Sequence, residues 1–123
     1  MTVPNRDLQI LDKILRYCSD IQFTHNEYHH NEETFYSNPT YRNAIALCLL
    51  QIGELVKNLS DDFTRANQSI PWSAIRGMRN VVAHHYGKID IETLWETSLQ
   101  DIQELQSFCK NQIECQNMQD ADK

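Results

Sequence analysis

The sequence lacks any apolar run long enough to form a signal peptide or to span a membrane. We therefore expect a cytoplasmic protein without a membrane partner. It also lacks a C-x-x-C pair among its four cysteines, which are Cys18, Cys48, Cys109 and Cys115. Cys18 and Cys48 fall within apolar helical patterns, so the spacing favours buried free thiols in a reducing compartment over disulfides or a metal site.

Acidic residues are missing from one long segment, although the chain is acidic overall. The net charge of −6 argues against a broadly basic surface for nucleic acid. Residues 63–89 contain no Asp or Glu, whereas Arg65, Arg76, Arg79 and Lys88 give this segment a charge of +4. We expect an anionic partner to be steered to this segment and repelled elsewhere.

Strand-like alternation is absent as well, and apolar residues recur at helical spacing in four segments. Their predicted starts and ends rest on capping signals. The four predicted helices cover residues 5–22, a second stretch from Asn38-Pro39 to Leu59, a third from Pro71 to about Gly87, and a fourth from Asp90 as N-cap. The second helix is apolar on more than one face, which predicts a central position or one shared with a second subunit.

These patterns predict an all-α fold, an antiparallel bundle of four to five helices. We expect one domain over residues 1–113, followed by a polar tail, residues 114–123, that frays. His25 and His29 stand at i,i+4, a spacing that can bind zinc on a helix. They fall in a polar linker without cysteines in a fitting pattern, so no metal site is predicted there.

The octapeptide RNVVAHHY, residues 79–86, lies within the acid-free segment. On an unbroken helix, Arg79 and His84 would point about 140° apart. Gly87 indicates that the helix ends just beyond, where the backbone can turn His84 back toward Arg79. Taken alone, this pattern favours an ordinary helix end at which a histidine binds free carbonyl groups.

The same two side chains are also the groups needed to cleave RNA without a metal. A histidine with a near-neutral pKa can take a proton from a hydroxyl or return one to a leaving group. A fixed guanidinium can bind a phosphate through two hydrogen bonds and stabilise charge that develops on it. The nucleophile would be the neighbouring ribose 2′-OH, which restricts the substrate to RNA.

Three sequence segments resemble those of one protein family. RNVVAHHY matches the R-xxxx-H-x-Y motif of HEPN-domain toxins. CLLQIGELVKNLS, residues 48–60, is similar to a second-helix segment around I-G-E. IPWSAIRGMRNVVAHHYGKIDIETLWET, residues 70–97, is similar to a tract that runs from P-W through the motif to a helix with a buried Trp. Over residues 5–110 the chain resembles the HepT-like ribonucleases of HepT/MntA (type VII) toxin–antitoxin pairs.

This resemblance implies an all-α HEPN homodimer with its active-site cleft at the dimer interface. Arg79 and His84 would be the catalytic residues of a metal-independent endoribonuclease toxin that needs no cofactor and cleaves tRNA or mRNA. The partner would be an MntA-like minimal nucleotidyltransferase antitoxin that transfers AMP from ATP to Tyr86. That modification places bulk and negative charge where the RNA phosphate must lie.

Three further residues are candidates for supporting roles. Asn80 is suited either to a phosphate contact or to holding the loop, and His85 is a possible phosphate contact or a bystander. Glu54 falls between apolar positions, where it would orient Arg79 or His84, or form a surface salt bridge. An alternative function also stays open: a non-catalytic HEPN module that binds nucleotides or a nucleotidyltransferase partner.

Overall fold

The structure of the chain is a computed structural model that describes residues 3–83 and 88–121. The backbone of these residues is predominantly helical and contains no strand. The predicted all-α class is therefore confirmed. None of the helices in these two ranges is both long and apolar enough to cross a membrane.

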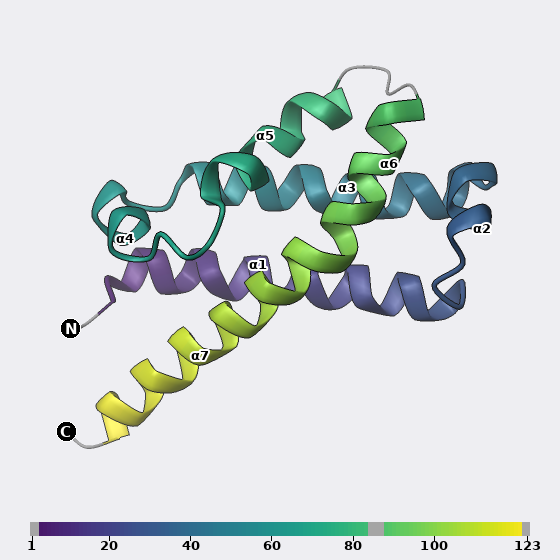
Figure 1. Cartoon of the computed structure of the whole chain (residues 1–123). Helices are drawn as coiled ribbons and strands as arrows, with labels where there is room; N and C mark the ends of the chain where they lie inside the picture. The colour runs from purple at the N-terminus through teal and green to yellow at the C-terminus, as the bar shows by residue number, and fades with distance from the viewer. Residues whose placement is uncertain (1–2, 84–87, 122–123) are drawn as a thin grey trace.

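Four long helical units form the bundle (Figure 1). Their order along the chain is α1 (Asn5–Glu27), α3 (Pro39–Lys57), α5 (Trp72–Ala83), and α6 (Lys88–Glu96) continued through a π-helical turn into α7 (Ile102–Ala121). Figure 1 shows α3 between α1 and α5, while α6 and α7 run diagonally across the bundle and α7 packs on α1. The central position predicted for the second helix is confirmed.

The start of α3 follows directly from its sequence. The side chain of Asn38 accepts hydrogen bonds from the backbone N–H groups of Thr40 and Tyr41, at 2.9 and 3.3 Å. Pro39 occupies the first helical position, where its missing N–H would have no helical partner. The predicted helix start is confirmed.

The core stripe of α3 differs slightly from the stripe that the apolar spacing of the sequence predicts, which is Tyr41, Ile45, Cys48, Ile52, Leu55 and Leu59. The large buried side chains of α3 are Tyr41, Ile45, Leu49, Ile52 and Val56, at spacings of four and three. Cys48 and Leu55 of the predicted stripe are only half-buried. The stripe is rotated because α3 packs against α1 and α5 at the same time.

Two segments predicted as linkers are partly helical. The first helix continues five residues beyond the predicted end to Glu27, and the short helix α2 (Glu32–Ser37) follows it. The second linker contains α4 (Asp61–Ala66). Each short helix is anchored by one buried aromatic side chain, Phe35 in α2 and Phe63 in α4. Short polar helices carry too few apolar residues for a period to be recognised in the sequence.

The C-terminal half of the chain also departs from the prediction at both ends. Asp90 lies in the first turn of α6 and is not its N-cap, because α6 begins at Lys88. At the other end, α7 continues to Ala121, through residues for which the sequence predicted fraying. Gln116 in this extension is buried, and its side-chain oxygen accepts a hydrogen bond from the Val3 N–H at 3.1 Å.

All four cysteines are free thiols, as predicted. Cys18 and Cys109 are buried in the core, Cys48 is partly covered and Cys115 is exposed. Burial raises the pKa of Cys109 to about 12 and that of Cys48 to about 11, and it also raises the pKa of Cys18. The core cysteines therefore behave as small apolar side chains.

Candidate active site

The candidate site lies where α3 and α5 approach each other most closely. A Cβ added at Gly53 would lie 3.2 Å from the carbonyl oxygen of Ile75, 3.4 Å from that of Arg76 and 3.5 Å from the backbone nitrogen of Arg79. Two of these distances fall in a range that is tighter than nine in ten contacts of real Cβ atoms. Glycine at this position therefore lets the backbones of the two helices pack almost directly against each other.

Glu54, the residue after Gly53, forms an ion pair with Arg79 of α5. The contact joins the Glu54 Oε1 atom to the Arg79 Nε atom. The pair is partly open to solvent, with 54 % of the Arg79 side chain and 38 % of the Glu54 side chain exposed. The terminal Nη groups of Arg79 make no hydrogen bond to the described residues, so this fork of donors remains available to an anionic ligand.

The structure places the predicted site residues as follows. It brings together Glu54 and Arg79 in a partly exposed ion pair, which fits both a surface salt bridge and an orienting contact, so the orienting role of Glu54 remains a prediction. Asn80 follows Arg79 on α5, is exposed, and does not join this pair. His84, His85 and Tyr86 lie outside the described residues, as does Gly87, so the convergence of His84 with Arg79 remains a prediction.

A second polar cluster, buried in the core, was missed in the sequence. The Nδ1 atom of His25 lies 2.5 Å from the Tyr41 hydroxyl, and its Nε2 atom lies 2.9 Å from the Ser98 hydroxyl. The Ser98 hydroxyl donates to the backbone carbonyl of Trp95 at 2.9 Å. Since Ser98 uses its proton in that bond, it accepts from His25 Nε2–H, and His25 Nδ1 accepts from Tyr41.

This arrangement holds His25 as a neutral imidazole. Burial, together with a smaller contribution from the nearby His30, lowers the pKa of His25 to about 4. Both ring nitrogens are engaged, so His25 is not available as a metal ligand, and His29 lies beyond the end of α1 with a left-handed φ of 58°. Among the described residues there is no group of three or more side chains suited to hold a metal ion.

The sequence did contain a signal for this cluster. His25 continues the apolar stripe of α1 formed by Leu11, Ile14, Cys18 and Ile21, at alternating spacings of three and four. The π-helical turn Thr97–Asp101, which includes Ser98, inserts an extra residue at the junction of α6 and α7. A distortion of this kind is not encoded in the apolar spacing of the sequence.

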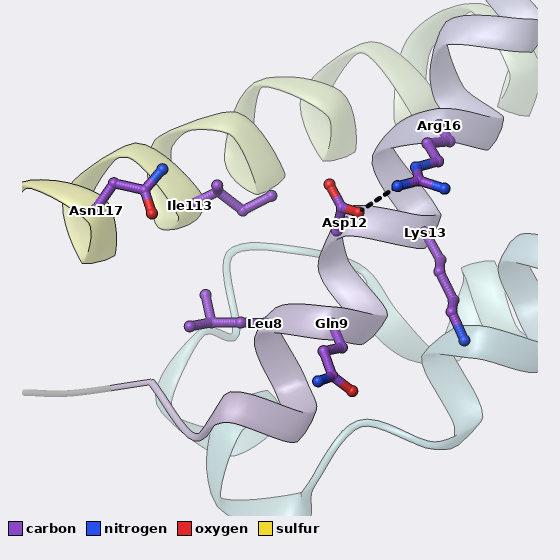
Figure 2. Close-up of a pocket in the computed structure, with 7 residues that line it drawn as sticks. All are labelled: Leu8, Gln9, Asp12, Lys13, Arg16, Ile113 and Asn117. Carbon is purple, nitrogen blue, oxygen red and sulfur yellow. Dashed lines mark ion pairs between the residues drawn. The ribbon is translucent and has the colours of Figure 1, made fainter. Parts of the chain in front are cut away.

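A cavity of about 380 Å³ lies away from the candidate site, between α1 and α7. Figure 2 shows Leu8 of α1 and Ile113 of α7 on its walls, with an ion pair between Asp12 and Arg16 at 3.1 Å. It contains none of the predicted site residues. In Figure 1 the C-terminal half of α7 and α5 lie on opposite sides of α1 and α3, so this cavity cannot be part of a site built on Arg79.

Comparison with known proteins assigns the family. A family model described as "Ribonuclease HepT-like" matches residues 8–111. The chain belongs to the HepT-like ribonuclease family. The resemblance found in the sequence is confirmed, and the matched range includes Gly53, the Glu54–Arg79 pair and the whole octapeptide 79–86.

Several curated relatives are identical to this HepT-like chain at between a third and two fifths of the aligned positions. "Putative RNase MJ1216" of Methanocaldococcus jannaschii is 38 % identical over 106 residues, which are 84 % of each chain. "Putative RNase MJ0125" of the same organism is 35 % identical over 84 % of this chain and 88 % of its own. "Probable ribonuclease HepT" of Thermococcus cleftensis is 36 % identical over 59 % of this chain and 66 % of its own. No solved structure matches the chain.

Proposed function

We propose that this HepT-like chain is a metal-independent endoribonuclease toxin. The observation that carries the proposal is the Arg79 guanidinium, held at its Nε by Glu54 with its Nη groups free of described partners. A guanidinium held this way binds a phosphodiester through two hydrogen bonds and stabilises the extra negative charge of a pentacovalent phosphorus. The curated relatives named as RNases support the same reaction class.

The reaction uses the RNA's own 2′-OH as nucleophile. His84 takes the proton from this hydroxyl while the oxygen attacks the adjacent phosphorus. The bond from phosphorus to the 5′-oxygen breaks, and the imidazolium returns a proton to that oxygen. The products are one strand with a 2′,3′-cyclic phosphate and one with a 5′-hydroxyl, and Arg79 balances the charge on the phosphoryl oxygens throughout.

We place the site at the interface of a homodimer. Leu47 lies two turns before Glu54 on the same face of α3, and 56 % of it is exposed. Burial of this exposed apolar side chain, on the face of α3 that carries Glu54, favours a second copy of the chain packing on this face. Arg79 and His84 of both copies would then line one cleft.

We further propose that an MntA-like minimal nucleotidyltransferase silences the enzyme. The Tyr86 hydroxyl attacks the α-phosphorus of ATP, loses its proton and releases pyrophosphate. The added phosphate and adenine occupy the space two residues from His84 where the RNA backbone must lie. A Tyr86→Phe variant, which lacks the acceptor oxygen, is expected to stay active in the presence of the nucleotidyltransferase and ATP.

Induced expression without the nucleotidyltransferase tests the proposal. Wild type is expected to arrest growth and to produce RNA fragments that end in a 2′,3′-cyclic phosphate. The His84→Ala and Arg79→Ala variants are expected to do neither, while His85→Ala retains toxicity. Intact RNA in cells that hold folded wild-type protein would instead support a non-catalytic module that binds nucleotides or the nucleotidyltransferase.

A further inference from the structure

A groove of about 240 Å³ lies beside the candidate site, between the end of α3, α4 and the start of α5. Three cations line it, Lys57 of α3, Arg65 of α4 and Arg76 of α5, against one carboxylate, that of Asp61. Its lining is therefore positively charged on a chain whose net charge is −6. Its lining also includes the polar side chains of Thr64, Gln68 and Ser73.

The groove continues the α3–α5 interface that holds the candidate site. Lys57 lies three residues after Glu54 on α3, and Arg76 lies three residues before Arg79 on α5. Gly53 faces residues 75–79, whereas Lys57, further along α3, lines the groove with Trp72 and Ser73 from the start of α5, so the two helices run antiparallel here. Three residues advance a helix by about 4.5 Å. Lys57 and Arg76 therefore lie about that far along the interface from the Glu54–Arg79 ion pair.

The three cations of the groove differ in the hydrogen bonds and ion pairs that they already form. Arg65 is bound within α4, where its Nε donates to the Asp61 carbonyl at 3.3 Å and its Nη2 contacts Asp62 at 3.4 Å. Lys57 and Arg76 are both exposed and form no ion pair with the described residues. Two unpaired cations facing one groove repel each other, and an anion between them relieves that repulsion.

We propose that this groove binds the phosphate backbone of a single RNA strand next to the scissile phosphate, with Lys57 and Arg76 as the principal contacts. The inference rests on the proposed ribonuclease function, which places one phosphate at Arg79. A strand that continues from Arg79 along the α3–α5 interface meets these two cations next. The groove recognises backbone charge and carries no base-specific role.

Binding of an oligonucleotide that cannot be cleaved tests the groove separately from catalysis. The probe is a single-stranded 2′-O-methyl oligoribonucleotide of about 12 nucleotides, which lacks the nucleophilic hydroxyl. Its affinity for the unmodified full chain is measured by fluorescence anisotropy between low and moderate salt. The test variant is Lys57→Gln with Arg76→Gln, and the matched control is Lys13→Gln with Lys110→Gln, which removes the same charge from exposed positions on α1 and α7.

Each phosphate contact on a single strand contributes about 0.7 to the slope of log affinity against log salt. Removing two contacts is expected to reduce this slope by about 1.4 and the affinity at 0.1 M salt by about 25-fold. The control pair is expected to lose far less on both measures. Equal salt slopes for the two double variants, or no binding by wild type, would overturn the proposal.

The groove and the proposed reaction can fail separately. If wild type binds the probe with a salt slope that depends on Lys57 and Arg76, the groove stands even when natural RNA of the same sequence is not cut. If wild type cuts that RNA and the Lys57→Gln, Arg76→Gln variant binds the probe like the control, only the groove assignment is wrong.

Discussion

Glu54 of α3 and Arg79 of α5 form an ion pair across the closest approach of the two helices, directly beside Gly53. The ion pair links Arg79, the predicted phosphate-binding residue, to α3, so its long side chain is not free in solvent. Its position beside Gly53 gives a structural reason for the order I-G-E in the sequence. Gly53 lets the two helices approach closely, and the approach brings Glu54 within contact of Arg79.

Because both side chains are partly exposed, we expect the pair to contribute to positioning more than to stability. Exposed ion pairs contribute about 0–1 kcal/mol to the free energy of unfolding. Glu54→Gln is therefore expected to leave the Tm nearly unchanged but to lower the kcat of RNA cleavage about tenfold, since a mispositioned guanidinium loses transition-state contacts. Glu54→Asp should recover part of the loss, and Glu114→Gln, on the exposed side of α7, should show none. Equal kcat values for Glu54→Gln and wild type would contradict a positioning role.

The two glycines of the α3–α5 pair should respond oppositely to alanine. At Gly53 a Cβ meets a backbone carbonyl at 3.2 Å, which forces the helices apart. We expect Gly53→Ala to lower the free energy of unfolding by about 1–3 kcal/mol. At Gly77 a Cβ meets nothing within 4 Å, so Gly77→Ala should raise it by about 0.5–1 kcal/mol. Urea unfolding of both variants checks the prediction, and a stabilised Gly53→Ala would refute the close approach.

We expect the buried, neutral His25 to make the free energy of unfolding fall in acid. Its pKa is lowered from 6.5 to about 4 in the folded chain. The unfolded chain therefore binds the proton more readily, and the stability contributed by neutral His25 is complete above pH 6.5 and lost as the pH falls toward 4. The slope should approach 1.4 kcal/mol per pH unit, for a total of about 3 kcal/mol.

Urea unfolding between pH 7 and pH 4 measures this slope in wild type and in His25→Gln. Other groups titrate in the same range, so His30→Gln, which removes an exposed histidine stacked on His25, is the control. The wild-type slope should be reduced in His25→Gln and mostly kept in His30→Gln. A slope that is the same in wild type and His25→Gln would show that His25 is not held neutral.

The four cysteines should react with a thiol reagent at three different rates. Cys115 is exposed, whereas Cys18 and Cys109 are buried with raised pKa values. We expect the native chain to be modified rapidly at Cys115, more slowly at Cys48, and at the other two only on the timescale of unfolding. Mass spectrometry of peptides at successive times checks the order. Early modification of Cys109 would contradict the packing of α7 on α1.

The parts of the fold that the sequence predicted are those with long regular patterns. Asn38-Pro39 set the start of α3, and the apolar spacing located the four long helices. The short helices were missed because Phe35 and Phe63 each anchor only a turn or two, too short for a period. The extension of α1 was missed because His25 looks polar in sequence, and its burial depends on partners at Tyr41 and Ser98 that are far along the chain.

For the candidate site, the sequence supplied the residue types and the structure supplied one of their contacts. The sequence predicts that Glu54 orients Arg79 or His84, or forms a surface salt bridge, and only the three-dimensional arrangement shows that its ion-pair partner is Arg79. Lys57 was not singled out, because its relation to Arg76 depends on the antiparallel register of α3 and α5. That register is set by the close approach at Gly53, a contact between backbones that leaves no periodic trace in the sequence.

The central claim is that the RNA's own 2′-OH, at a phosphate held by Arg79, is the nucleophile. The most direct measurement uses purified, unmodified chain in the presence of a chelator and an RNA oligonucleotide whose cleavage position has been mapped. A second oligonucleotide carries a single 2′-deoxyribose at that position. The account predicts that the all-ribose strand yields a 2′,3′-cyclic phosphate end and that the single deoxy substitution abolishes cleavage there. Cleavage of the deoxy-substituted bond at the same rate, or a requirement for added divalent metal, would contradict it.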